Sequence, residues 1–270
     1  MTNYLEILKP LPAVKNNIKV VLFDFDGTIS TLRQGWEKIM EPLMIEMISG
    51  NSSPDQELIE KVRDFIDEST GVQTIHQMFW LEKQVREYGK NPEIKDAWWY
   101  KEEYNHRLLK VVKSRTDKLI RGELSPEDYR IKGSYEFMED LYHRGIDIYI
   151  ASGTDDVDVQ QEVQSIGVKQ FVKHVAGAPH RKVDCSKEAV IKSLLNDQQL
   201  KGSELLLVGD GKVEISLGVY AGAITLGAAT DEVKCNGVND FKRNKLIKAG
   251  AHAIVGDFTQ FTGIYKWLGL

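Results

Sequence analysis

The sequence predicts an α/β fold in which a Rossmann-like, doubly wound parallel sheet is interrupted by a long all-α insertion. Two observations carry this prediction. From residue 133 onward, short aliphatic and β-branched runs alternate with amphipathic stretches, which is the pattern of parallel strands joined by right-handed helical crossovers. Between residues 31 and 127, by contrast, apolar residues recur at spacings of three and four and no strand-like run occurs, as is typical of helices.

The individual elements follow in order along the chain. Residues 1–17 are expected to have little structure of their own, and residues 18–25 to form the first strand. The insertion is expected to hold four helices, with Pro54 and Pro92 in first turns, at residues 35–48, 54–68, 72–88 and 92–120. A hinge is expected at residues 124–126. Beyond it we expect helices at residues 133–144, 155–166, 187–195, 213–221 and 240–249, and strands at residues 146–151, 171–175, 204–208, 223–226 and 253–255.

Composition narrows the class of protein. With 42% hydrophobic and 28% charged residues, the 270-residue chain is an ordinary globular protein, long enough for one large domain or a core with an insert. Its net charge of -5 gives no basic footprint for nucleic acid, and no stretch approaches the ~20 apolar residues of a membrane span. The first residues lack the apolar segment of a signal peptide, and Cys185 and Cys235 form no Cys-x-x-Cys pair. We therefore expect a cytoplasmic protein with free thiols.

The most informative stretch is Val20–Thr28, an apolar run that ends in the sequence Asp-Phe-Asp-Gly-Thr. On an extended strand Asp24 and Asp26 point the same way, and like charges so placed repel unless a cation or a shared proton compensates. A hard divalent cation is the simplest partner. Gly27 allows the backbone to turn, and Thr28 can bond to an aspartate or to the backbone. An acidic turn without function is the alternative, whereas an EF-hand is excluded because the glycine comes too early.

Three further stretches place polar groups at the same edge of the predicted sheet. Ser152 and Gly153 end a strand just before a helix, where a hydroxyl and backbone amides can bind phosphate oxygens, although such a serine also serves as a turn residue. Asp210 ends another buried strand, and Glu214, four residues later, faces the same side of the following helix. Lys187 opens a predicted helix, where a lone lysine is usually solvated.

Together these four stretches resemble the four motifs of the haloacid dehalogenase superfamily, and in particular those of its phosphatases. The resemblance implies that Asp24 is the nucleophile, that Asp26 is the general acid and base, and that the cofactor is Mg²⁺. The implied metal ligands are Asp24, Asp26 through its main-chain carbonyl, and Asp210, with Glu214 acting directly or through water. The implied phosphate-binding residues are Thr28, Ser152, Gly153 and Lys187, with Lys182 as the second candidate for the lysine.

The same resemblance implies a domain organisation. An insertion between the first and second motifs is a helical cap in this superfamily, so we expect an all-α cap domain over residues 32–130. Residues 1–31 and 131–270 are then expected to form the Rossmann-like catalytic core. Four tryptophans fall inside the insertion, and they either build its own core or line a substrate pocket; they are Trp36, Trp80, Trp98 and Trp99.

The expected function is that of a Mg²⁺-dependent phosphatase acting on a small phosphomonoester, a sugar phosphate or a phosphorylated organic acid, through an aspartyl-phosphate intermediate. The expected partner is accordingly a small phosphorylated metabolite. One alternative is a phosphosugar mutase of the same superfamily, and another is a non-catalytic binding protein that retains the fold. The six histidines form no ligand pair at helical spacing, so zinc has no support, although His180 is a candidate for a position near the pocket.

Overall fold

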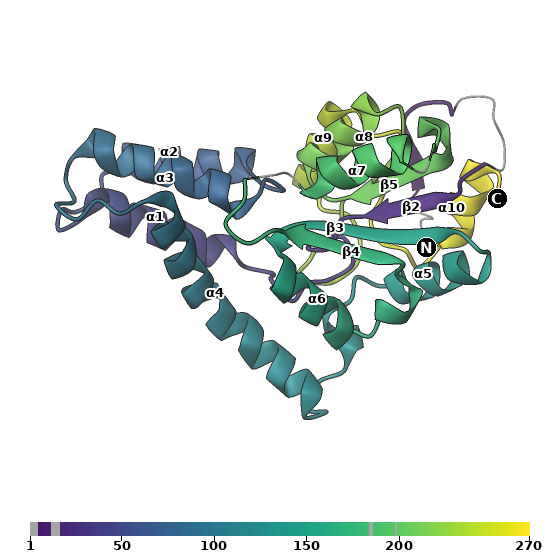
Figure 1. Ribbon diagram of the computed structural model, residues 1–270, viewed down its shortest axis with the longest axis horizontal. Helices are drawn as coiled ribbons and strands as arrows, with labels where there is room; N and C mark the ends of the chain where they lie inside the picture. Colours follow the sequence, from purple (N-terminus) through teal and green to yellow (C-terminus); the bar gives the residue numbers. More distant parts are fainter. Residues whose placement is uncertain (1–4, 12–16, 184–185, 198) are drawn as a thin grey trace.

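The computed structural model describes residues 5–11, 17–183, 186–197 and 199–270 of the chain. At its centre lies a seven-stranded sheet (Figure 1). Its strands are β1 (Leu5–Ile7), β2 (Val20–Phe23), β3 (Asp147–Asp155), β4 (His174–Ala178), β5 (Leu205–Gly209), β6 (Ile224–Ala228) and β7 (Ala253–Val255). Their order across the sheet is β1-β7-β6-β5-β2-β3-β4, and every neighbouring pair is parallel except β1 and β7. The chain thus winds outward in both directions from β2, which confirms the predicted doubly wound α/β fold.

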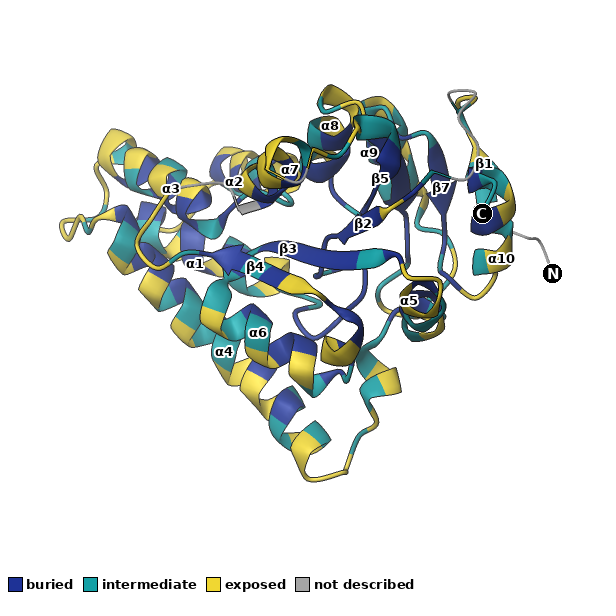
Figure 2. Cartoon of the chain, turned by 45° about the vertical axis from the view of Figure 1, so that its right-hand side comes forward, coloured by how far each residue is buried: buried dark blue, intermediate teal, exposed yellow. Residues whose placement is uncertain are grey.

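Helices cover both faces of this sheet (Figure 1). One face carries α5 (Ser134–His143), α6 (Asp156–Ser165) and α10 (Phe261–Leu268), and the other carries α7 (Ser186–Asn196), α8 (Lys212–Tyr220) and α9 (Asp240–Ala249). Because side chains alternate along a strand, Val21 and Phe23 of β2 pack on the first group while Val20 and Leu22 pack on the second. The central strands are therefore buried on both sides, as their colour in Figure 2 shows.

The helical insertion consists of α1 (Glu37–Ser49), α2 (Gln56–Glu68), α3 (Thr74–Tyr88) and α4 (Ala97–Ile120), between β2 and β3. It has a hydrophobic core of its own, built from apolar side chains of all four helices. In Figure 1, α1, α2 and α3 stand away from the sheet, while α4 runs back toward it beside α6. The division of the chain into domains at residues 31 and 131 remains a prediction.

Polar contacts fasten the helical insertion to the core along α4 and α6. Arg33, in the segment that leads into the insertion, donates from Nε to Glu162 Oε1 at 3.0 Å and from Nη2 to the same oxygen at 2.6 Å. Lys101 and Asn105 of α4 both bond to Asp155 at the end of β3. These contacts hold one side of the insertion close to the carboxyl ends of the strands.

Several sequence-based expectations for the elements are wrong in detail. Residues 5–7 form the edge strand β1, because β7 supplies the hydrogen bonds that so short a segment cannot obtain alone. Neither Pro54 nor Pro92 lies in a first turn: α2 and α4 begin later, after Asp55 and Asp96, whose side chains accept N–H groups of the first turn at 2.9 and 2.8 Å. The expectation for residues 1–4 and 12–16 lies outside the described residues.

Other elements differ in length or were not expected. Helix α10 was missed, although its apolar face completes the core beside α5. Strand β4 lies three residues later than predicted, and β3 extends to Asp155 through an irregularity after Ala151. The extension brings Ser152 to Asp155 into the sheet edge, so the second polar stretch belongs to the strand itself.

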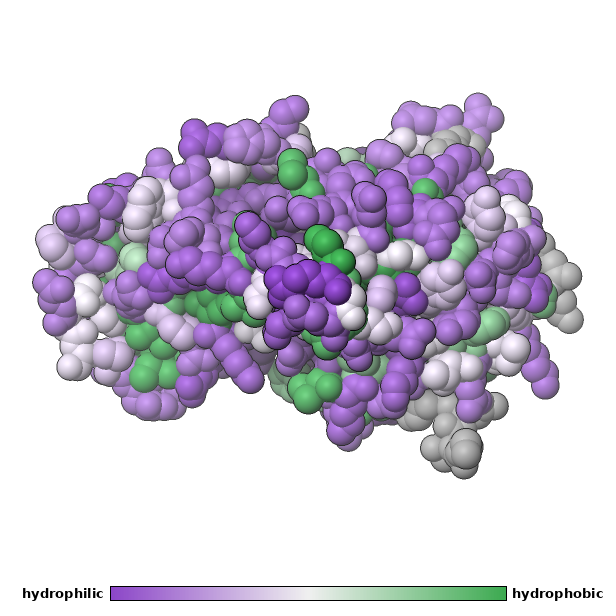
Figure 3. Space-filling view, turned by 90° about the horizontal axis from the view of Figure 1, so that it is seen from below, coloured by the Kyte–Doolittle hydropathy of each residue, from purple (hydrophilic) through white to green (hydrophobic). Residues whose placement is uncertain are grey.

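The surface offers no exceptional feature on the face seen in Figure 3, which is mostly hydrophilic with small, separate hydrophobic patches. No helix in the described ranges is both long and apolar enough to cross a membrane. Cys235 is a free, partly exposed thiol, as expected. Cys185 lies outside the described residues.

Candidate active site

The predicted site residues meet at the carboxyl edge of the sheet. Asp24 directly follows β2 and Asp210 directly follows β5, while Ser152 lies near the end of β3. These three strands are neighbours, because β2 pairs with β3 on one side and with β5 on the other. The Asp24 N–H donates to the carbonyl of Val208 at 2.8 Å, so the sheet fixes the backbone up to the first carboxylate.

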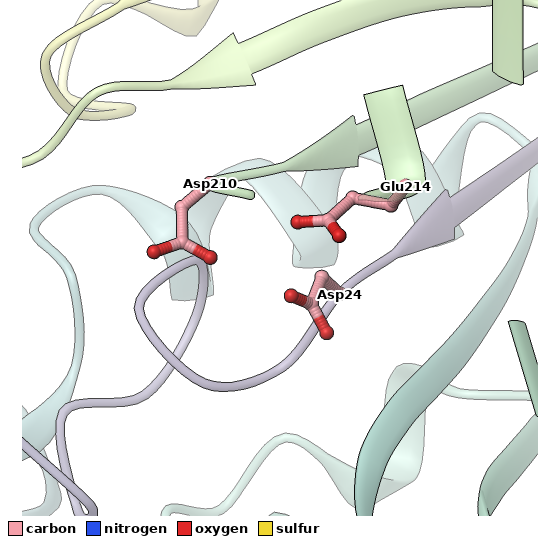
Figure 4. A group of neighbouring side chains, drawn as sticks. All are labelled: Asp24, Asp210 and Glu214. Carbon is pink, nitrogen blue, oxygen red and sulfur yellow. The ribbon is translucent and has the colours of Figure 1, made fainter. Parts of the chain in front are cut away.

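Three carboxylates form a compact group at this edge (Figure 4). Asp24, Asp210 and Glu214 each offer an oxygen, and these oxygens all lie within 4.8 Å of one another. Burial raises the pKa of Asp24 well above its usual value, and the neighbouring carboxylates raise it further although the charge of Lys187 opposes them; a bound cation would relieve the remaining repulsion. Carboxylate oxygens are the donors that Mg²⁺ prefers, so this set of residues fits the expected metal.

Lys187 reaches into the centre of this group from the start of α7. Its Nζ lies 3.0 Å from Asp24 Oδ2 and 3.0 Å from Glu214 Oε2, and its side chain is buried. Burial alone would lower the pKa of Lys187, but the two carboxylates raise it far above the ordinary lysine value, so the ammonium stays charged. Lys182, the second candidate, is exposed and does not line the cavity described below.

Glu214 already uses both of its oxygens. Oε1 accepts the Gly211 N–H at the start of α8, and Oε2 accepts from Lys187. Burial alone would raise the pKa of Glu214, but Lys187 and these hydrogen bonds hold it below the usual value. The carboxylate therefore caps the helix and orients the lysine at the same time.

Asp26 is held by hydroxyl groups at the end of β3. Its Oδ2 accepts from Ser152 Oγ at 3.2 Å and from Thr154 Oγ1 at 2.9 Å, while its Oδ1 is buried and has no hydrogen-bond partner among the described residues. Gly153 lines the same cavity. Thr28 differs from the other predicted residues, because its side chain is fully buried away from the cavity.

Gly27 explains why the turn after Asp26 needs a glycine. Its φ is 71°, in the left-handed region that other residues rarely adopt, and a Cβ there would lie 2.3 Å from Asp210 Oδ2. The absence of a side chain thus lets the loop after β2 pack directly against the carboxylate that follows β5.

A cavity of about 310 Å³ lies above these residues, between the sheet edge and the helical insertion. On the insertion side it is lined by Trp36, Glu37, Thr74, Gln77 and Tyr104, among others. The tryptophans of the insertion divide between the two expected roles. Trp36 lines the cavity, whereas Trp80 stacks on Phe65 within the insertion, with ring centroids 3.9 Å apart. His180 is not among the residues that line the cavity.

Sequence reasoning missed a second lysine of the site. Lys242 of α9 places its Nζ 2.5 Å from Asp210 Oδ2 and 2.5 Å from Glu232 Oε1. Burial alone would lower the pKa of Lys242, but these carboxylates raise it. The sequence held a weak indication of this contact. Lys242 is the third residue of α9, and a cation in the first turn of a helix is unfavourable unless carboxylates lie near it.

Comparison with known proteins agrees with this architecture. The sequence profile of the haloacid dehalogenase-like hydrolases matches residues 21–228, and the chain belongs to this family. Among solved structures, it is similar to β-phosphoglucomutase from Clostridium difficile, with 15% identity, a TM-score of 0.62, and coverage of 93% of this chain and 97% of that one.

Two further solved structures show the same fold. A protein described as a predicted phosphoglycolate phosphatase from Haemophilus somnus 129PT has 14% identity and a TM-score of 0.62, with 92% of this chain and 98% of that chain covered. A phosphonoacetaldehyde hydrolase-like protein from Oleispira antarctica has 13% identity and a TM-score of 0.63, with 97% and 96% covered. No curated protein matches the chain. At these identities the solved structures establish the fold alone.

Proposed function

We propose that the protein is a Mg²⁺-dependent phosphatase that hydrolyses a small phosphomonoester through an aspartyl-phosphate intermediate. One observation carries the proposal: the Asp24 carboxylate lies at the carboxyl end of β2, 3.0 Å from the Lys187 ammonium and within 4.8 Å of an Asp210 oxygen. A carboxylate so placed can attack an electrophile whose negative charge the lysine neutralises.

The reaction proceeds in two displacements at phosphorus. An Asp24 oxygen attacks phosphorus, the bond to the alcohol oxygen breaks, and Asp26 gives its proton to the leaving alcohol. Asp26 then takes a proton from water, which attacks phosphorus and releases Asp24. Lys187 and the Ser152 hydroxyl stabilise the charge on the phosphoryl oxygens.

The metal would be held by Asp24, the main-chain carbonyl of Asp26, and Asp210. When bound, Mg²⁺ offsets the repulsion between the attacking carboxylate and the phosphoryl group. Glu214 accepts hydrogen bonds from Lys187 and the Gly211 N–H, so its proposed roles are to position Lys187 and to reach the metal either directly or through water. The substrate is a small phosphorylated metabolite, in keeping with a cavity of about 310 Å³, and the compartment is the cytoplasm.

Hydrolysis of nitrophenyl phosphate tests the proposal. We expect turnover that is abolished by chelation of divalent cations and restored by added Mg²⁺. The same preparation should release phosphate from at least one member of a panel of sugar phosphates and phosphorylated acids. Phosphoryl transfer to added sugar phosphate that outpaces phosphate release would instead identify a mutase. The absence of Mg²⁺-dependent hydrolysis with every compound would indicate a binding protein.

A further inference from the structure

The cavity carries more carboxylates than cations. Its lining includes seven carboxylate residues, namely Asp24, Asp26, Glu37, Asp67, Asp210, Asp231 and Glu232. It includes five cationic residues, namely Arg33, Lys187, Lys212, Lys242 and Lys245. A bound Mg²⁺ and a bound phosphoryl group carry nearly equal and opposite charges, so their joint binding leaves the carboxylate excess in place.

Most of the cations are already paired with carboxylates. The two lysines of the site bind Asp24 and Asp210, as shown above. Arg33 is held by Glu162, and Lys245 pairs with Asp67, whose Oδ1 lies 3.7 Å and whose backbone oxygen lies 3.0 Å from the lysine Nζ. Lys212 is the remaining cation of the lining, and its side chain is exposed at the start of α8. A second anionic group on a ligand would therefore meet no buried cation that is free to bind it.

Glu37 is one of two carboxylate residues on the insertion wall, and the other, Asp67, is paired with Lys245. Glu37 is the first residue of α1, and it forms no ion pair with any residue in the described ranges. Glu37 is exposed to solvent although it lines the cavity. Desolvation by the surrounding protein raises its pKa, and the charges of Lys242 and Asp210 both act on it across the cavity. The insertion side of the cavity also offers uncharged hydroxyl groups, those of Thr74 and Tyr104.

We propose that the leaving alcohol of the substrate is an uncharged polyhydroxy compound, and that Glu37 selects it. The carboxylate accepts hydrogen bonds from hydroxyl groups of the alcohol and repels a second phosphate or a carboxylate at the same place. This inference rests on the proposed phosphatase function and narrows its substrate from phosphomonoesters in general to sugar or polyol phosphates.

The same feature distinguishes hydrolysis from phosphoryl transfer within a sugar. A mutase that moves a phosphoryl group between two hydroxyls of one sugar passes through a doubly phosphorylated compound. Such a compound places a second phosphate on the insertion side of the cavity, where the charges are those of Glu37 and Asp67. We therefore expect a sugar bisphosphate to bind more weakly than the corresponding monophosphate.

A matched pair of compounds tests the selection by Glu37. Glycerol phosphate and phosphoglycerate, phosphorylated at the same terminal carbon, differ by one carboxylate. At about pH 8 we expect the wild-type protein with Mg²⁺ to prefer glycerol phosphate in kcat/KM by about tenfold, a ratio that corresponds to ~1.4 kcal/mol, because the carboxylate of phosphoglycerate is repelled by Glu37. If either compound is turned over too slowly, its inhibition of nitrophenyl phosphate hydrolysis gives the same comparison.

Glu37→Gln keeps the shape of the side chain and removes its charge. We expect this variant to reduce the preference roughly threefold to tenfold, mainly through better use of phosphoglycerate. Glu68→Gln on α2 is the control, because Glu68 is exposed, does not line the cavity, and undergoes the same change of charge. Circular dichroism and thermal melting establish that both variants are folded.

Two results would overturn the inference while leaving the phosphatase proposal intact. One is an equal or better use of phosphoglycerate by the wild-type protein. The other is a preference that stays unchanged in the folded Glu37→Gln variant. A complete lack of Mg²⁺-dependent hydrolysis of nitrophenyl phosphate would contradict the proposed function itself.

Discussion

The two walls of the cavity are built in different ways. The core wall consists of groups at the ends of strands and the starts of helices, such as Asp24, Asp210 and Lys187, and nearly all of its charges are paired. The insertion wall consists of side chains on helices and the segments between them, and apart from Glu37, Asp67 and the paired Arg33 it offers uncharged groups. The difference suggests that the core supplies the chemistry and the insertion selects the substrate.

This contrast has a physical cause in the backbone. Phe23 is aligned with Ile150 of β3 and with Val208 of β5, so the residues that follow each strand must meet at one edge. No such alignment acts on the insertion wall, where a side chain reaches the cavity only through the way its helix packs. In the proposed function, the positions of the catalytic groups thus follow from the sheet topology, whereas substrate selection depends on the surfaces of the inserted helices.

Removal of the nucleophile should have the largest effect. We expect Asp24→Asn to lower kcat by at least ~10³-fold, because the variant loses the oxygen that attacks phosphorus. Asp147→Asn is the control: Asp147 is aligned with Val20, so it lies at the opposite edge of the sheet, and its loss should change kcat less than about twofold. Near-normal turnover by Asp24→Asn, with contaminating phosphatase excluded, would show that Asp24 is not the nucleophile.

Replacement of the proposed acid and base should separate the two displacements. We expect Asp26→Ala to lower steady-state turnover of nitrophenyl phosphate by about 10²-fold or more, because water loses its base. The activated leaving group needs little protonation, so the first step should survive better. Rapid-quench measurement should then show a burst of nitrophenol near one equivalent per site. A variant that retains Mg²⁺ affinity but shows no burst would assign the second step to another base.

A smaller effect concerns the contact between Arg33 and Glu162 that fastens the insertion to the core. We expect Glu162→Gln to lower the free energy of unfolding by about 2 kcal/mol, or the melting temperature by about 5 °C, because Arg33 would keep a buried charge without its closest carboxylate partner. Glu188→Gln, which breaks an exposed pair with Lys192, should cost less than about 0.5 kcal/mol. Equal losses in the two variants would show that the buried pair does not strengthen the attachment of the insertion.

Most residues of the core wall could be predicted from the sequence. Asp24 and Asp210 could be placed because each ends a buried apolar run, and such runs become parallel strands whose ends coincide. Lys187 was predicted from the resemblance to a family motif, and the structure brings it to Asp24. The side chain of Thr28, in contrast, is fully buried and does not line the cavity, since its position in the tight turn after Asp26 is set by backbone geometry that the motif does not reveal.

The rest could not be predicted because it depends on packing between distant segments. Lys242 reaches Asp210 only because α8 and α9 pack beside each other on one face of the sheet. Strand β1 is too short to show a period, and it exists because β7 offers an open edge. The composition of the insertion indicated helices, but not which face of α1 or α3 would meet the cavity.

The closed base of the helical insertion also bears on how the chain folds. The Thr31 N–H donates to the Tyr129 carbonyl at 2.8 Å, so the two ends of the insertion lie side by side. Without this closure, the pairing of β2 with β3 must close a loop of roughly 120 residues, whereas with it the loop is roughly 25 residues. The longer loop costs about 1.4 kcal/mol more in chain entropy. Because the insertion has its own hydrophobic core, early formation of that core shortens the effective loop. The insertion would then accelerate assembly of the central strands as well as cover the finished site.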